Sequence, residues 1–322
     1  MSADALSQPP SSGGPQYLQV DREASGQRID NFLLRHLKGV PRSHLYRVLR
    51  RGEVRVNKGR VKPEYRLRLG DEVRIPPLRL APQGEGVALP ARAGAWIEGA
   101  ILYEDERVLV IDKPAGLAVH GGSGLSHGLI ELLRAARPGQ TLELVHRLDR
   151  DTSGCLLVSK RRSALRELHR LLREKALEKR YLALLVGRLP QAEVTVEAAL
   201  RKNLLQGGER VVRVDAVEGK AARTHFRRLR SLPGATLVEA RLVTGRTHQI
   251  RVHAAHLGLP LAGDEKYGDA ARNRALREVG LRRLFLHAAV LGFRTGEDGP
   301  VIQVQAPLPS ELEGMLARLE GQ

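Results

Sequence analysis

The sequence predicts an α+β fold with a mixed, mainly antiparallel sheet and flanking helices. Strand-like segments are numerous after residue 96, and they follow one another in long runs rather than alternating with helices as βαβ units do. A few segments, in contrast, carry apolar residues at helical spacing. With 322 residues, the chain is long enough for two domains of unequal size.

The charge balance indicates a polyanionic partner. Lysine and arginine number 53 against 36 acidic residues, which leaves a net charge of +17 and a pI of about 10.7. A membrane partner is not expected, because no segment reaches the ~18 consecutive apolar residues of a spanning helix. The single cysteine, Cys155, excludes an intramolecular disulfide and favours a cytoplasmic location.

Composition divides the chain into four parts. Residues 1–16 are rich in Ser, Pro and Gly, do not form a signal peptide, and are expected to be a disordered tail. Residues 17–80 form a first domain with 16 basic and 7 acidic residues. Residues 81–95 are rich in Pro, Gly and Ala and are expected to be a linker. Residues 96–322 form the second, larger domain.

The first domain is predicted to contain two helices followed by strands. Ser25 is a plausible N-cap for the first helix, and the second begins near residue 41. The apolar residues at helical spacing are Ile29, Phe32, Leu33 and Leu37 in the first helix and Leu45, Val48 and Leu49 in the second. Apolar and polar residues then alternate at 54–57 and at 72–75, which predicts two strands.

The second helix has a basic face. Its members are Arg42, Arg47, Arg50 and Arg51. A solvated helix face usually mixes both signs of charge, whereas the segment 42–51 contains no acidic residue. This pattern favours contact with RNA or DNA over a face that merely meets solvent.

Residues 17–80 resemble the S4 RNA-binding domain. The resemblance is carried by Arg28–Leu33, Arg42–Leu45, Gly52–Asn57 and Leu69–Val73. It implies that the two helices and the following hairpin, with Arg55 and Lys62, form a basic surface for structured RNA. Such a surface positions the protein through phosphate and shape without reading sequence.

The larger domain has readable elements in order. Strands are predicted at 107–112, 155–158, 178–187, 237–243, 283–293 and 301–305. Helices are predicted after Ser163, which is a plausible N-cap, from about residue 247 and from Ser310. A glycine-rich stretch at 119–124 lacks the Gly-Lys-Ser/Thr ending of a P-loop, so it is not expected to bind a nucleoside triphosphate.

The segment 144–154 places Asp149 between Arg147 and Arg150, in a polar loop that leads into the strand at 155–158. Nearby guanidinium groups favour the charged form of a carboxylic acid, so Asp149 is expected to stay ionised. A positioned carboxylate can attack, abstract a proton or stabilise a cation. Taken alone, a carboxylate among arginines is more often part of a surface ion pair.

Two further features have a structural and a functional interpretation. Tyr181 begins an apolar strand and, taken alone, is more often a core residue than a catalytic one. His248, His253 and His256 invite a metal site, but no acidic or cysteine ligands accompany them at metalloprotease spacing, so no metal is expected. Arg251 lies beside the apolar face of the predicted helix.

Three ordered motifs make residues 100–310 similar to the RluA family of pseudouridine synthases. They are His146–Asp149, Lys179–Ala183 and Gly245–His253, with supporting stretches at 112–116, 259–268 and 284–288. The loop at 119–124 and the stretch 202–210 are most similar to family members that act on the large ribosomal subunit. The resemblance implies an isomerase that needs no cofactor.

The resemblance also implies residue roles. Asp149 is the catalytic aspartate, and Arg251 is the arginine paired with it. Tyr181 stacks on the uracil and takes the C5 proton. Arg147 enters the RNA where the base leaves.

We therefore expect conversion of uridine to pseudouridine in 23S ribosomal RNA, either free or within a precursor of the ribosomal subunit. The target base is expected to flip into a pocket. The alternatives are the same chemistry on other rRNA or tRNA uridines, a non-catalytic RNA-binding or ribosome-assembly protein, and an RNA hydrolase. The hydrolase lacks a clear second carboxylate, since Asp151 is separated from Asp149 by Arg150.

Overall fold

A computed structural model of the chain describes residues 14–37, 40, 42–77, 96–121, 128–206, 209–294 and 299–321. The chain forms two compact units, and the division falls after Ala88. That position lies within the expected linker, which is itself outside the described residues. Most of the expected tail, residues 1–13, also lies outside them, as do residues 122–127 with the end of the glycine-rich loop.

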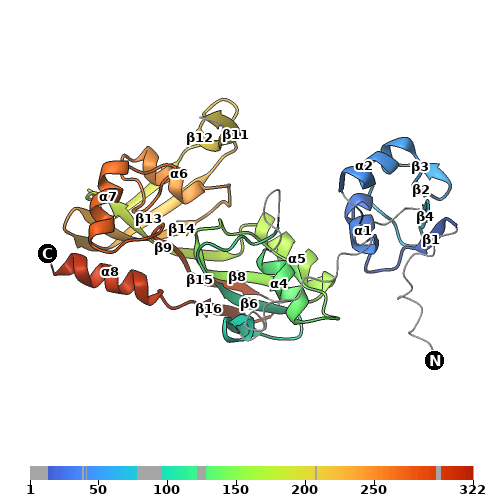
Figure 1. The fold of residues 1–322 in the computed structure, drawn as a ribbon, viewed down its shortest axis with the longest axis horizontal. Coiled ribbons are helices and arrows are strands. Elements are labelled where there is room, and N and C mark those ends of the chain that lie inside the picture. Colours follow the sequence, from blue (N-terminus) through green and yellow to red (C-terminus); the bar gives the residue numbers. More distant parts are fainter. Residues whose placement is uncertain are drawn as a thin grey trace. The chain divides into compact units, whose positions relative to one another are not determined.

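The first unit packs two helices on a small antiparallel sheet (Figure 1). Its elements are β1 (Gln16–Gln19), α1 (Ile29–His36), α2 (Arg42–Arg51), β2 (Arg55–Val56), β3 (Gly59–Arg60) and β4 (Glu72–Ile75). The strand order is β1-β4-β2-β3. The predicted apolar faces of both helices are buried, with Ile29, Leu33 and Leu45 fully inside. Strand β1 begins at Gln16, so the tail prediction extends one residue too far.

The large sheet of the second unit is mixed and mainly antiparallel, as predicted. Its described strands are β5 (Ile101–Glu104), β6 (Val108–Lys113), β7 (Glu143–Leu144), β8 (Ser153–Ser159), β9 (Glu178–Val186), β10 (Glu193–Glu197), β13 (Arg223–Leu232), β14 (Ala235–Leu242), β15 (Leu286–Arg294) and β16 (Val301–Gln305). The order is β10-β13-β14-β9-β15-β8-β6-β5, with β16 beside β15 and β7 beside β8. Within the described part of this sheet, only β15 and β8 pair in parallel.

Helices cover both faces of this sheet. They are α4 (Leu129–Ala136), α5 (Arg162–Arg173), α6 (Gln249–His256), α7 (Ala270–Glu278) and α8 (Ser310–Glu320). A separate hairpin, β11 (Leu200–Gln206) and β12 (Glu209–Val214), packs near α6. Alternate residues of β9 enter different cores: Tyr181 and Ala183 join Ile250 of α6, whereas Leu184 joins Met315 of α8. The sheet thus places the side chain of Tyr181 on the same side as α6.

Two predicted helix caps are wrong. Helix α1 begins at Ile29, so Ser25 lies in the preceding turn. Helix α5 begins at Arg162, which puts Ser163 inside its first turn after the N-cap residue Arg161. Neither N-cap residue accepts a hydrogen bond through its side chain. Burial of the apolar face, rather than a local cap, therefore determines where each helix begins.

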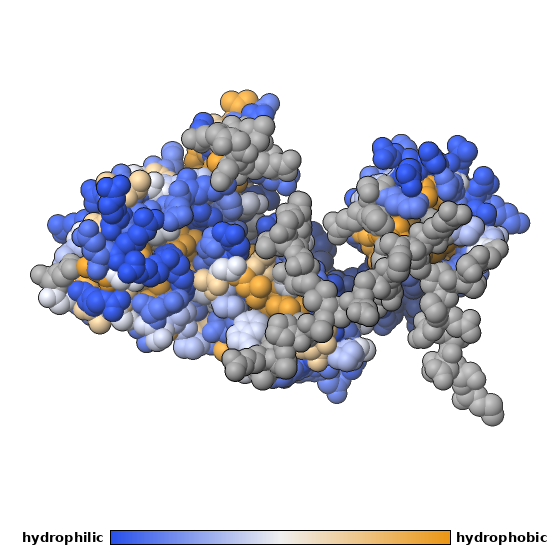
Figure 2. Space-filling model, viewed as in Figure 1, coloured by the Kyte–Doolittle hydropathy of each residue, from blue (hydrophilic) through white to orange (hydrophobic). Residues whose placement is uncertain are grey.

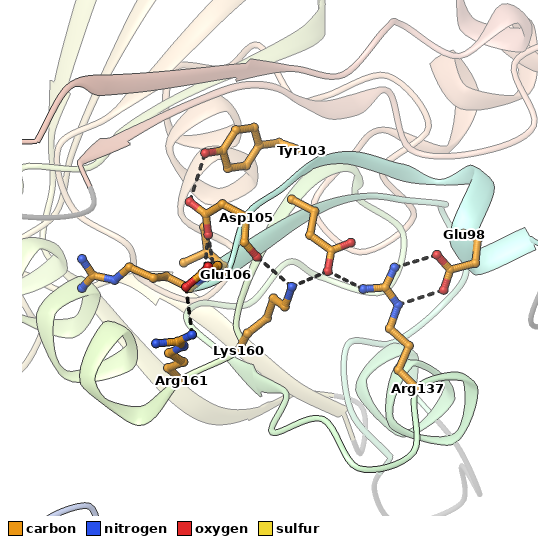
Figure 3. A network of polar contacts seen from close by, with 10 residues as sticks. Glu98, Tyr103, Asp105, Glu106, Arg137, Lys160 and Arg161 are labelled. Atoms are coloured by element: carbon orange, nitrogen blue, oxygen red, sulfur yellow. Dashed lines mark hydrogen bonds and ion pairs between the residues drawn. The ribbon is translucent and has the colours of Figure 1, made fainter.

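A polar network ties the end of α4 to the β5 edge of the sheet (Figure 3). The Arg137 guanidinium donates to Glu98 at 2.6 and 2.8 Å and to Glu104 at 2.6 Å, and the Lys160 ammonium donates to Glu104 at 2.6 Å. The Arg137 hydrogen bonds are the largest cause that lowers the pKa of both carboxyls, and Lys160 further lowers the pKa of Glu104. Within the described ranges, no helix has the length and apolar character that crossing a bilayer requires.

Candidate active site

A cavity of about 560 Å³ lies in the second unit. Its walls come from the loop before β8, the end of α5, the first half of β9, and the segment that joins β14 to α6. Asp149, Tyr181 and Arg251 all line it. The fold therefore brings the three predicted catalytic residues to one place, although Asp149 and Arg251 are 102 residues apart in the sequence.

Arg251 connects two carboxylates at the bottom of this site. Its Nε and Nη2 atoms donate to the two oxygens of Asp264, each at 2.8 Å, and Nη1 lies 3.5 Å from Asp149 Oδ2. The Asp264 side chain is fully buried, and that of Asp149 is 18% exposed. Burial alone would raise the pKa of Asp264, but Arg251 and the amides of Tyr267 and Lys266 outweigh burial and lower it. Arg251 is therefore held by Asp264 and presented to Asp149.

His248 meets Asp149 from another side. Its Nε2 lies 3.7 Å from Asp149 Oδ2, and its Nδ1 lies 2.7 Å from the Tyr267 hydroxyl. The hydroxyl also accepts the Val212 N–H of β12 at 3.0 Å, and the Tyr267 ring lies under the Arg251 guanidinium at 5.0 Å. Burial lowers the pKa of His248, and the charge of Asp149 opposes this shift.

The backbone at His248 is unusual. Its φ of 52° is left-handed, which costs a non-glycine residue roughly 1–2 kcal/mol. The following residue stabilises this turn, because the Gln249 amide oxygen accepts the Arg246 N–H at 3.0 Å and the Thr244 hydroxyl at 2.7 Å. A strained backbone conformation of this kind persists only where surrounding contacts hold it in place, and it often marks a functional position.

Tyr181 is both a core and a cavity residue. It is 6% exposed and belongs to the main apolar core, yet its ring forms part of the cavity wall. Burial first, and the charge of Asp149 second, raise the pKa of its phenol above the ordinary value. The phenol therefore stays protonated, and a flat neutral ring faces the cavity near Asp149.

Lys113 and Gly154 support the loop that carries Asp149. The fully buried Lys113 ammonium donates to the carbonyls of Pro114, Leu117 and Arg150 at 2.7, 2.8 and 2.9 Å. Burial lowers the pKa of Lys113 to about 8. At the far end of the loop, Gly154 has a φ of 106°, and a Cβ there would lie 2.3 Å from the Ala288 carbonyl oxygen. Only glycine fits that position.

The arginines of the loop have different environments. Arg147 is exposed and lines the cavity, where it can meet an incoming polyanion. Arg150 points elsewhere, since its Nε lies 3.1 Å from Asp151 in an exposed ion pair. The charge partner of Asp149 is therefore Arg251 and not the neighbouring Arg150, and Asp151 is a surface carboxylate.

The basic residues predicted in the first unit lie on α2 and the strands after it. Arg47, Arg50, Arg51, Arg55 and Lys62 are exposed, and Arg42 begins α2, although its side chain is outside the described set. Arg51 has one distant acidic neighbour, Glu53, at 3.8 Å. Figure 2 shows hydrophilic side chains gathered over α2 and the neighbouring strands. This surface is suited to phosphate contact.

The three histidines considered as metal ligands point in different directions. His248 faces Asp149, whereas His253 is fully buried between the Thr224 hydroxyl and the Ala198 carbonyl. His256 is exposed at the end of α6. Within the ranges that the structure describes, no three His, Cys, Asp or Glu side chains converge as a metal site would need.

Sequence reasoning assigned no role to Asp264, Tyr267 or His248. Asp264 and Tyr267 lie in the segment 259–268, which matched the family without suggesting a function, and His248 was considered only as a metal ligand. A buried aspartate in a tight turn before α7 carries no local signal of its partner, because that partner is an arginine on α6.

Comparison with known proteins identifies the family of this chain. The sequence pattern of the family described as RNA pseudouridylate synthase matches residues 107–256, and that of the S4 domain matches residues 27–73. Ribosomal large subunit pseudouridine synthase C of Escherichia coli (strain K12) is 55% identical over 93% of this chain and 95% of its own length. The corresponding protein of Haemophilus ducreyi is 50% identical over 97% and 98%.

Two solved human structures share the fold. Human RNA pseudouridylate synthase domain containing 1 is 31% identical, with a TM-score of 0.55 over 66% of this chain and 85% of the other. Human RNA pseudouridylate synthase domain containing 4 is 26% identical, with a TM-score of 0.58 over 70% and 95%. Both family resemblances inferred from sequence are confirmed.

Proposed function

The chain belongs to the RNA pseudouridylate synthase family, and from that premise we propose that it isomerises uridines of large-subunit (23S) ribosomal RNA to pseudouridine, with Asp149 as the essential carboxylate. Supporting this target, the curated relatives with 50–55% identity are named as large-subunit enzymes. We also propose a cytoplasmic location, which the single cysteine favours.

The observation that carries the proposal is the placement of Asp149. Its carboxylate lies in the cavity wall, 3.5 Å from a guanidinium that a buried second carboxylate holds in place. The buried Asp264–Arg251 pair thus fixes a cation beside the Asp149 carboxylate. The RNA hydrolase alternative would use a second carboxylate in the cavity, but Asp264 is occupied by Arg251 and Asp151 is paired at the surface.

The reaction breaks the N1–C1′ bond of uridine and forms a C5–C1′ bond, while C5 loses a proton and N1 gains one. The product therefore contains the same atoms as the substrate, because the proton lost from C5 is balanced by the proton gained at N1. In this position Asp149 can attack the sugar or the base, or accept a ribose proton, and each route breaks the same glycosidic bond. Arg251 and His248 both approach the same carboxylate oxygen of Asp149, at 3.5 and 3.7 Å.

The other predicted residues receive roles that fit their surroundings. Tyr181 offers its neutral ring to one face of the uracil. Its raised pKa weighs against a phenolate that takes the C5 proton, so stacking is the role we propose for it. Arg147, exposed at the cavity, enters the RNA as the base leaves its stack, which costs a few kcal/mol.

The test is release of tritium from RNA labelled at uracil C5. We expect wild-type protein to release label from 23S rRNA and to leave pseudouridine at defined positions. Asp149→Asn, which keeps the shape but not the charge, should release label only at background level. The matched control is Asp151→Asn in the same loop, which should release label as wild type does.

Equal release by wild type and Asp149→Asn would remove Asp149 from the mechanism. Release from tRNA or small-subunit rRNA, but none from 23S rRNA, would overturn the target while leaving the chemistry intact.

A further inference from the structure

Lys179 is a charged side chain in the active-site cavity that the mechanism above does not use. It lies on β9, two residues before Tyr181, and successive side chains of a strand point to opposite faces. Lys179 and Tyr181 therefore share one face, and both line the cavity that holds Asp149. An ammonium group is thus carried beside the proposed stacking platform for the base.

The Lys179 ammonium group lines the cavity and lies close to the turn at Gly245. In the part of the chain that the structure describes, it makes no hydrogen bond and no ion pair, although it is half-buried, and burial lowers its pKa. Lys113 shows how this fold satisfies a buried lysine, with three carbonyl oxygens within 2.9 Å. An ammonium that is partly withdrawn from water and left without such partners is prepared to bind an anion.

His146 and the turn at Gly245 lie near Lys179. His146 Nε2 accepts the Leu157 N–H at 3.1 Å, so that ring nitrogen has no lone pair to offer. Burial, and then the charge of Lys179, lower the pKa of His146 to about 4. The turn at Gly245 passes close to the Lys179 Nζ, and Arg246 of the same turn lines the cavity.

We propose that Lys179 binds a backbone phosphate next to the target uridine while the base lies against Tyr181. The inference rests on the proposed function, because RNA is the polyanion whose base enters this cavity. A flipped nucleotide brings its own phosphates to the cavity, and a single ammonium acts on them as a point charge. Lys179 is then a binding residue that selects the flipped geometry.

The experiment uses the full-length chain and a 23S rRNA fragment that contains one uridine mapped as modified by the wild type. Lys179→Met should raise the dissociation constant roughly 10-fold or more, as expected for loss of one charge-assisted contact. The slope of log K against log salt should fall by about 0.7. The single-turnover rate at saturating protein should fall by less than the affinity does.

A neutral methylphosphonate placed on either side of the target uridine locates the contact. At one of the two linkages it should weaken wild-type binding as Lys179→Met does, and it should add nothing further to that variant. The matched control is Lys220→Met, an exposed lysine outside the cavity wall, which should leave the response to either methylphosphonate as in wild type.

Because Lys179→Met could impair folding, a second measurement uses unaltered protein. Acetylation of Lys179, followed by mass spectrometry, should be suppressed by the RNA fragment and not by an equal concentration of inorganic phosphate. A wild-type dissociation constant for Lys179→Met, additive effects of variant and methylphosphonate at both linkages, or acetylation unaffected by RNA would each overturn the inference. If the wild type itself releases no tritium from 23S rRNA, the proposed function fails instead.

Discussion

Replacing Asp264 with asparagine should destabilise the second unit and slow the reaction together. Asp264 is fully buried, and both its oxygens accept from Arg251 at 2.8 Å. Asparagine can keep one acceptor, but it leaves the buried guanidinium without its counter-charge. Loss of one partner of a buried pair costs about 3–5 kcal/mol. Because one acceptor survives, we expect the free energy of unfolding to fall by about 3 kcal/mol and Tm to fall by about 6–12 °C.

The rate should fall because Arg251 loses the group that orients it towards Asp149, 3.5 Å away. Thermal unfolding followed by circular dichroism measures the first effect, and tritium release under single-turnover conditions measures the second. The control is Asp151→Asn, since Asp151 also pairs with an arginine but at the surface. The Asp151→Asn substitution should lower the free energy of unfolding by at most about 1 kcal/mol. Equal Tm shifts for the two variants would refute the reasoning.

The pH dependence gives an independent check. The folded-state pKa of Asp264 lies below its ordinary value of 3.8, so its contribution to stability is fully present above that value. The contribution is lost as the pH falls through the folded-state pKa. The difference in urea midpoint between wild type and Asp264→Asn should therefore be constant near pH 7 and should shrink below about pH 4. A difference that does not change with acidification would show that the carboxylate charge is not what stabilises the pair.

Two other predictions concern the support of the loop and the first unit. Lys113→Met should lower the free energy of unfolding by about 2–4 kcal/mol, because carbonyls that accept from the ammonium lose a buried donor; a wild-type urea midpoint would contradict this. Changing Arg47 and Arg50 of α2 to glutamine should reduce the slope of log K against log salt for RNA binding by about 1.4–1.8. An unchanged slope would mean that this face does not contact phosphate.

Strong local patterns made much of the fold predictable. The apolar stretch at 178–187 and the segment 301–305 became β9 and β16 with ends at or within one residue of those predicted. Strands β10 and β13 were missed because they lie at one edge of the sheet with a solvated face. In β13 the described side chains are mostly polar or exposed, and Phe226 is its fully buried apolar residue. Strand β13 carries too few apolar residues to show a period of two. Strand β10 does alternate, with Val194 and Val196 as its apolar residues, but it is only five residues long.

The site was predictable only in part, for a similar reason. Ordered motifs identified Asp149, Tyr181 and Arg251 through resemblance, but local spacing could not distinguish Arg251 from Arg150 as a partner for Asp149. Arg150 is adjacent in sequence and yet turns to Asp151. Contact between a loop and a helix 102 residues apart depends on strand order and on how α6 packs on the sheet.

The sequence by itself determined the α+β class, the basic charge, the positions of most long strands and the family, because these properties depend on local periodicity, composition and ordered motifs. Only the tertiary structure decided that Asp264 holds Arg251, that His248 approaches Asp149 and contacts Tyr267, and that Lys179 lines the cavity, where the described residues offer it no partner. These are contacts between distant segments. Their geometry follows from sheet register and side-chain packing, which short stretches of sequence do not encode.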